Sequence, residues 1–89
     1  MKLSVKDLVQ HQWYCAEPSW GHYKYYFIFK RCGGISIIFT YYSIIFDKRN
    51  KSFGHCSDYL LFNHSGEFTH INGTYSPEEM IDYIKASEL

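Results

Sequence analysis

The fold is decided by residues 22–46, whose sequence is HYKYYFIFKRCGGISIIFTYYSIIF. Tyr, Phe and Ile dominate both halves of this stretch, and these residue types suit the pleated, half-buried surface of a β-strand. Gly33 and Gly34 separate the halves and can adopt the positive φ angles of a type I′ turn. The stretch therefore predicts a hairpin with strands over 22–31 and 35–46.

A two-residue turn places Cys32 opposite Ile35, which sets the predicted register of this hairpin. One face then pairs Phe29 with Ile38. The opposite face holds five large apolar or aromatic side chains: Tyr26, Ile28, Ile37, Phe39 and Tyr41. Because both faces are largely apolar, we expect both to need a covering layer.

The N-terminal segment predicts a helix over 5–14. Ser4 and Asp7 have the spacing of a capping box with Asp in place of Glu, and Leu3 and Leu8 occupy the positions of a hydrophobic staple. The residues that follow this start recur at helical spacing: Val5, Leu8, Val9, Gln12 and Trp13. This spacing places them on one face of a helix.

The C-terminal segment carries the strongest local signal in the chain. Ser76 is followed by Pro77 and, three residues on, by Glu79. This is a capping box with Pro at the first helical position, and it predicts a helix over 77–86.

A second hairpin is predicted between the basic loop and this helix. Its strands cover 56–63 and 67–72 and are joined through His64-Ser65-Gly66, although their alternation is weaker. The whole chain, 1–89, is thus expected to form a single α+β domain. Its expected architecture is a four-stranded antiparallel meander sheet with an N-terminal and a C-terminal helix, in the order α-β-β-β-β-α.

The composition argues against several kinds of chemistry. Nine Lys+Arg balance nine Asp+Glu, so a polyanion-binding surface over the whole molecule is not expected. Cys15, Cys32 and Cys56 contain no closely spaced pair of the kind that zinc sites use. No Gly-rich turn leads into a helix to bind a phosphate. We therefore expect no metal site, no cofactor and no catalytic residue.

The sequence also predicts a compartment. Residues 1–20 contain no basic start followed by an apolar run, as a secretory signal would. The longest apolar region, 35–46, is interrupted by Ser and Thr and is shorter than the ~20 residues of a membrane helix. We expect a soluble, cytoplasmic protein with no membrane partner and with free thiols.

The aromatic side chains suggest a binding surface, because 7 Phe, 9 Tyr and 2 Trp exceed what two short helices can cover. Tyr is enriched at protein interfaces. If both helices pack on the face of Phe27, Phe29 and Ile38, the opposite face stays exposed. The predicted partner-binding residues are this face and the basic loop: Tyr26, Ile28, Ile37, Phe39, Tyr41, Lys48, Arg49 and Lys51. Two alternatives stay open: the helices enclose both faces, or a second copy covers the sheet in a homodimer.

A functional expectation follows from size and composition. Phe, Tyr, Ile, Asn and Lys, whose codons are AT-rich, far outnumber Gly, Ala, Arg and Pro, a bias found in many bacteriophages. We expect a non-enzymatic protein that binds another protein, by analogy a small phage or mobile-element accessory protein that inhibits a host protein, as anti-CRISPR proteins do. The alternative is a nucleic-acid-binding domain that uses the 48–51 loop, Lys30 and the sheet tyrosines, with steeply salt-dependent binding.

Overall fold

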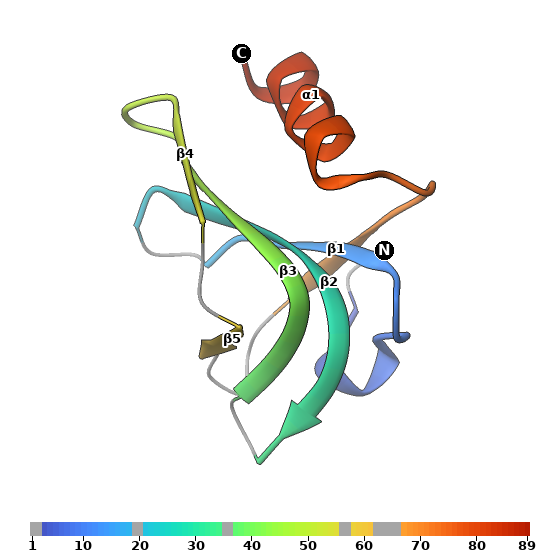
Figure 1. The fold of residues 1–89 in the computed structure, drawn as a ribbon. Coiled ribbons are helices and arrows are strands. Elements are labelled where there is room, and N and C mark those ends of the chain that lie inside the picture. The colour runs from blue at the N-terminus through green and yellow to red at the C-terminus, as the bar shows by residue number, and fades with distance from the viewer. Residues whose placement is uncertain (1–2, 19–20, 35–36, 56–57, 62–66) are drawn as a thin grey trace.

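The computed structural model describes residues 3–18, 21–34, 37–55, 58–61 and 67–89. These residues form a small α+β fold with an antiparallel sheet and a C-terminal helix (Figure 1). The elements are, in chain order, the 3₁₀ turn η1 (Val5–Asp7), β1 (Trp13–Ala16), β2 (Tyr23–Gly33), β3 (Ile37–Asp47), β4 (Ser52–His55), β5 (Tyr59–Leu61), β6 (Phe68–Ile71) and α1 (Pro77–Glu88).

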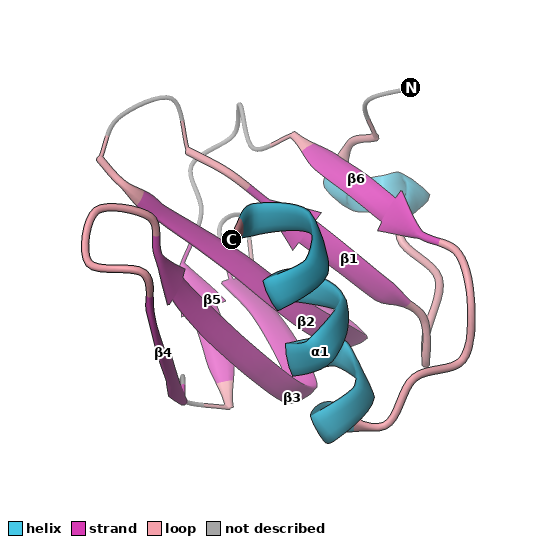
Figure 2. Ribbon diagram, turned by 90° about the horizontal axis from the view of Figure 1, so that it is seen from above, coloured by secondary structure: helices cyan, strands magenta, loops and turns pink. Residues whose placement is uncertain are grey.

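The long strand β3 pairs with three other strands. β2 runs along one edge of β3, whereas β4 and β5 share the opposite edge: β4 pairs with residues 44–47 and β5 with residues 37–39. The order across the sheet is β4-β3-β2-β1-β6, with every neighbouring pair antiparallel. Seen from above, α1 lies across this sheet between the β4 and β6 edges (Figure 2).

Two β-bulges interrupt the pairing of β2 with β3. Ile28 pairs with Tyr42 but Phe29 pairs with Thr40, so Tyr41 is an extra residue on β3. Arg31 then pairs with Phe39, which leaves Lys30 as an extra residue on β2. Bulges bend a strand and increase its local twist. Both strands curve strongly in Figure 1, and this bend separates the hairpin tip from the part of the sheet beneath α1.

The sheet has a hydrophobic core on each face. The helix core lies under α1 and consists of Trp13, Tyr26, Ile44, Phe46, Ile71, Met80 and Ile84. The inner core lies on the face away from α1 and consists of Leu8, Tyr14, Ala16, Phe27, Phe29, Ile38, Leu60 and Phe68, with Leu3 and Val5 packed against it. The helix therefore covers one face, while the N-terminal segment and β5 help to close the other.

The predicted hairpin exists, but its predicted register is wrong. Phe29 pairs with Thr40 and not with Ile38, and the ladder begins with Gly33 opposite Ile37. Gly33 belongs to the strand because the Phe39 ring lies over it: an added Cβ would come within 2.3 Å of the Phe39 Cε2 atom. Outside the bulges the ladder is displaced by three residues. An odd displacement changes which β3 side chains share a face with those of β2.

The predicted N-terminal helix over 5–14 is also wrong. The Asp7 carboxylate accepts hydrogen bonds from the Ser4 N–H and hydroxyl, both at 2.9 Å, but the helical segment is only the turn Val5–Asp7. His11 has a positive φ of 68°, and β1 starts at Trp13. Strand alternation sends Trp13 into the helix core and Tyr14 into the inner core. Burial on two opposite faces favours a strand over a one-sided helix here.

The four-strand layout is wrong as well, whereas the C-terminal helix is confirmed. In the part of 56–63 that the structure describes, β5 pairs with β3 and not with the 67–72 strand, and the predicted connection 64–66 lies outside the described residues. The 67–72 strand is present as β6, but it pairs with β1. Ser76 Oγ accepts from the Glu79 N–H at 3.2 Å, which completes the predicted capping box of α1. No helix among the described residues is long and apolar enough to cross a membrane.

Candidate functional site

The structure divides the predicted binding face in two. Tyr26 is 3% exposed and Ile28 is half-buried, and both pack in or against the helix core. Ile37, Phe39 and Tyr41 lie nearer the hairpin tip, which is distant from α1 (Figure 1). The part of the predicted face that stays uncovered by the helix is thus the part beyond the bulges.

We call this uncovered region the tip surface and define it by Lys30, Arg31, Ile37, Phe39, Tyr41 and Tyr59. Arg31, Phe39 and Tyr59 lie directly across from one another on β2, β3 and β5. Their neighbours Ile38 and Leu60 point into the inner core. Because side chains alternate along a strand, the three residues point to the opposite, outer side.

The side chains of these three residues lie in a row, with the Phe39 and Tyr59 rings tilted by 55° to each other. The Arg31 guanidinium carbon lies 4.0 Å from the centroid of the Phe39 ring, and the Phe39 and Tyr59 centroids are 6.5 Å apart. Phe39 is half-buried, whereas Tyr59 is 46% exposed. A guanidinium over an aromatic face is a cation–π contact that leaves its N–H edge directed outward.

The two bulge residues meet in a second cluster. The Lys30 Nζ atom lies 5.4 Å from the centroid of the Tyr41 ring, and the His11 ring stacks on Tyr41 at 4.7 Å with an interplanar angle of 13°. The Gln10 amide donates to the Tyr41 hydroxyl at 3.0 Å, and the His11 N–H donates to the Phe29 carbonyl at 2.9 Å. Bulges and positive-φ residues concentrate where a protein re-aims side chains for a function.

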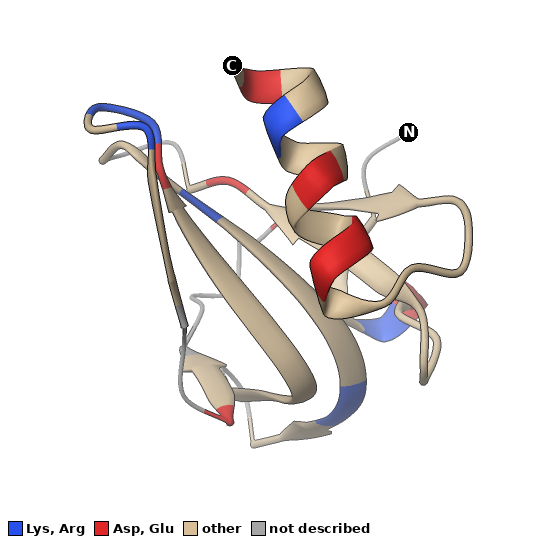
Figure 3. Ribbon diagram, turned by 45° about the horizontal axis from the view of Figure 1, so that its top comes forward, with Lys and Arg blue, Asp and Glu red and all other residues tan. Residues whose placement is uncertain are grey.

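The tip surface carries two cations without a carboxylate partner among the described residues. The ion pairs within that part of the chain involve Lys24 and Lys48, not Lys30 or Arg31. The basic end of β2 is visible at the hairpin tip in Figure 3. The exposed acid Asp58 directly precedes β5 in the sequence. Apolar area and accessible positive charge therefore coincide at this end of the molecule.

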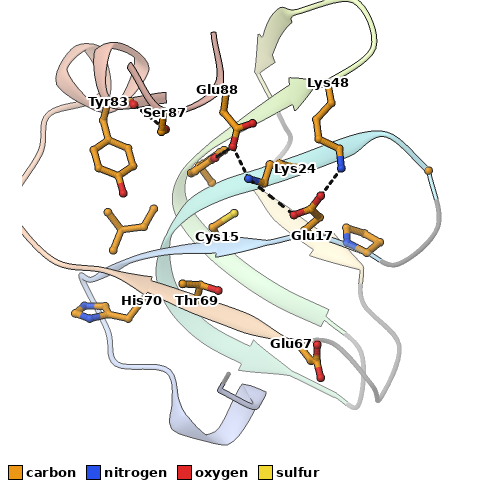
Figure 4. A pocket seen from close by; sticks show the side chains of 14 residues that line it. Cys15, Glu17, Lys24, Lys48, Glu67, Thr69, His70, Tyr83, Ser87 and Glu88 are labelled. Carbon is orange, nitrogen blue, oxygen red and sulfur yellow. Dashed lines mark hydrogen bonds and ion pairs between the residues drawn. The ribbon is translucent and has the colours of Figure 1, made fainter. Parts of the chain in front are cut away.

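A charged groove of about 560 Å³ lies at the opposite end, beside the C-terminal half of α1. Lys48, Glu17, Lys24 and Glu88 form an alternating chain along it (Figure 4). The Lys24 Nζ atom lies 3.8 Å from Glu17 Oε1, and it is also paired with Glu88. The Tyr26 hydroxyl donates to Glu88 Oε1 at 3.3 Å. These contacts satisfy the groove's charges internally and hold the end of α1 against β2.

Burial and ion pairing shift the pKa values of several titratable groups in the groove. Burial raises the pKa of the Cys15 thiol to about 11, so it is protonated near neutral pH. The hydrogen bond from Lys48 lowers the pKa of Glu17. Burial alone would lower the pKa of Lys24, but the hydrogen bond and charge of Glu88 outweigh it and raise that pKa. Glu17 and Lys24 therefore both stay charged at neutral pH.

The basic loop lies beside this groove and not at the tip surface. Lys48 is paired with Glu17, and the Lys51 ammonium donates to the Glu88 carbonyl at 3.4 Å. The backbone N–H of Arg49 donates to the Asp47 carboxylate at 2.9 Å, as part of the tight turn. The eight predicted binding residues thus fall into separate regions, and Lys30 is remote from 48–51 along the β2–β3 pair.

The described residues contain no group of three His, Cys, Asp or Glu side chains placed to hold a metal ion. Cys15 and Cys32 are free thiols, and Cys56 lies outside the described residues. The sequence-based expectations that the chain has no metal, no cofactor and no catalytic residue stay predictions.

Sequence reasoning missed three residues of this end of the molecule: His11, Arg31 and Tyr59. Arg31 is the last residue of the predicted strand over 22–31, but only the true register brings it opposite Phe39. Tyr59 lies in the predicted strand over 56–63, but no local sequence pattern predicts that this strand pairs with β3. The predicted helix over 5–14 contains His11 and gives no reason to expect its contact with Tyr41.

No protein-family model, no curated protein and no solved structure matches this chain.

Proposed function

We propose that this protein acts by binding another protein through the tip surface, without catalysing a reaction. The observation that carries the proposal is the position of Ile37, Phe39, Tyr41 and Tyr59 beyond the reach of α1, with two cations stacked on the rings. Tyr, Phe and Arg are the residue types enriched in the centres of protein interfaces. The charged groove supports binding less well, because its lysines are already paired with carboxylates.

The amino-acid composition of the chain is the basis for proposing what kind of partner it binds. The AT-rich residue usage and the small size favour a phage or mobile-element accessory protein whose partner is a host protein that it inhibits. A second copy of the chain is the other occupant to be tested, because a homodimer through the tip surface would cover the same residues. Static light scattering on the purified protein, with and without the tip substitutions below, separates these two occupants.

Photo-crosslinking tests the proposal directly. A benzoyl-phenylalanine replaces Tyr59 in one variant and Tyr83 in another, since both tyrosines are substantially exposed but Tyr83 lies on α1 and lines the groove. We expect a discrete adduct from position 59 in cells of the source organism and none from position 83. An adduct only at position 83 would move the binding site to the groove.

The identified partner then allows a quantitative measurement. We expect Tyr59→Ser to weaken binding by about tenfold or more, as aromatic interface residues do, while Tyr83→Ser leaves the dissociation constant unchanged. Equal affinities of the wild-type and Tyr59→Ser proteins would refute the proposed surface.

A further inference from the structure

We infer that the tip surface recognises an acidic segment of its partner, with carboxylates at Arg31 and Lys30 and an apolar side chain against the exposed Tyr59 ring. This inference rests on the proposed function and adds the chemistry of the bound segment.

Lys30 and Arg31 are available to bind an external anion. Among the described residues, neither Lys30 nor Arg31 has an ion-paired carboxylate, in contrast to Lys24 and Lys48 in the groove. A charged donor without an internal partner binds an external carboxylate without first breaking an existing pair. Lys6, Arg49, Lys51 and Lys85 are likewise without an ion pair, but among the described residues only Lys30 and Arg31 also lie over aromatic rings.

Lys30 and Arg31 are also held in place by neighbouring rings before anything binds. The Phe39 ring lies over Gly33 and carries the Arg31 guanidinium at 4.0 Å, so the side chain that would hold the anion is already positioned. The Lys30 Nζ atom is similarly placed over Tyr41, at 5.4 Å from the ring centroid. Less side-chain entropy is lost on binding when donors are held in place beforehand.

The tip surface suits an acidic peptide better than a single-stranded nucleic acid. Nucleobases bind to proteins by stacking on free aromatic faces, with several cations following the phosphates. At the tip, His11 stacks on Tyr41 at 4.7 Å and Arg31 lies over Phe39 at 4.0 Å, so ring faces are already in use. The remaining basic residues of the 48–51 loop lie beside the groove, which breaks any continuous basic track.

A peptide titration tests the inference with the full chain. Amide chemical shifts of the ¹⁵N-labelled protein are followed while acetyl-Glu-Glu-Phe-Glu-Glu-amide is added, and separately its lysine counterpart and a thymidine oligonucleotide. We expect saturable shifts at Lys30, Arg31 and Phe39 with the acidic peptide alone. Raising the salt from about 50 mM to about 500 mM should weaken this binding, because screening shortens the range of the charges.

Two substitutions with the same change of charge test whether the acidic peptide binds at the tip surface. Arg31→Glu should weaken binding of the acidic peptide by about tenfold or more, whereas Lys85→Glu, the same charge change on the exposed side of α1, should leave it unchanged. Arg31→Gln is the second variant if Arg31→Glu perturbs the fold, and a native-like spectrum is required of each variant.

These experiments separate failure of the inference about acidic segments from failure of the proposed function. Acidic-peptide binding that Arg31→Glu abolishes supports the inference. Equal shifts with the lysine peptide, tighter binding of the oligonucleotide, or no shift at the tip at millimolar peptide overturns it. If the peptide fails while Tyr59→Ser still weakens binding of the identified partner, the proposed surface stands and only its acidic specificity is rejected.

Discussion

At the residue scale, Gly33 leaves space for an aromatic ring within the hairpin. It lies within β2, opposite Ile37, and its missing side chain makes room for the Phe39 ring. The neighbouring Gly34 has a φ of +64° and supplies the left-handed conformation that the chain needs just after the strand. The two glycines thus have different physical roles, although they are identical in sequence.

Gly33→Ala should destabilise the protein by about 1–3 kcal/mol, since the new methyl group would overlap the Phe39 ring. Urea denaturation measures the change in the free energy of unfolding. Cys32→Ala is the control, because Cys32 is an exposed neighbour in the same strand, and we expect it to change stability by less than ~0.5 kcal/mol. The loss from Gly33→Ala should shrink in a Phe39→Leu background, and additive losses would contradict this contact.

Cys15 gives a prediction about pH. The folded thiol has a pKa of about 11 because it is buried, against an ordinary value of 9.0. Between these pH values the folded chain keeps a proton that the unfolded chain has lost, so the free energy of unfolding falls as the pH rises. The stabilisation is fully present below pH 9.0. The difference in unfolding free energy between the wild type and Cys15→Ala should therefore decrease from pH 9.0 to about 11. A constant difference across that range would contradict burial of the thiol.

At the element scale, α1 shows how local and tertiary interactions combine. Its start is set by the Ser76 capping box, which needs only neighbouring residues. Its position depends on Met80 and Ile84, which are both fully buried in the helix core. Its end is held by Glu88, which meets Lys24 and Tyr26 of β2. The C-terminal contacts join the helix to the sheet over a large separation in sequence.

Glu88→Gln should loosen the end of α1 and lower the free energy of unfolding by about 1–3 kcal/mol, because Lys24 loses a charged partner in a mostly buried place. Denaturation and hydrogen exchange of the α1 amides measure this effect. Asp82→Asn is the matched control, since Asp82 is exposed on the same helix, and it should alter stability little. Equal effects of the two substitutions would show that the contact with Lys24 contributes nothing.

At the scale of the whole molecule, the balance of charges conceals an uneven distribution. The chain has no net charge, but the groove end contains paired lysines and glutamates whereas the tip end has cations over aromatic rings. Both faces of the sheet are covered in part: one by α1, the other by the N-terminal segment and β5. Among the described residues, many aromatic side chains therefore belong to the two cores, and the exposed ones are divided: Tyr41 and Tyr59 lie near the tip, Tyr23 at the other end of β2 and Tyr83 on α1.

The sequence by itself determined the elements whose signals are local. The run of aromatic and β-branched residues specified β2 and β3, and the capping box with Pro77 specified α1. These predictions succeeded because strand propensity and helix capping depend on residues within a few positions of one another. The α+β class follows from them.

Only the tertiary structure decided the register, the N-terminal strand and the exposed surface. Register depended on the Phe39 ring resting on Gly33, and β1 depended on Trp13 and Tyr14 finding cores on opposite faces. The tip surface depended further on the bulge at Tyr41 and on where α1 packs. In each case the alternative arrangements have similar local propensity. The arrangement that forms is the one that buries side chains from distant parts of the sequence together.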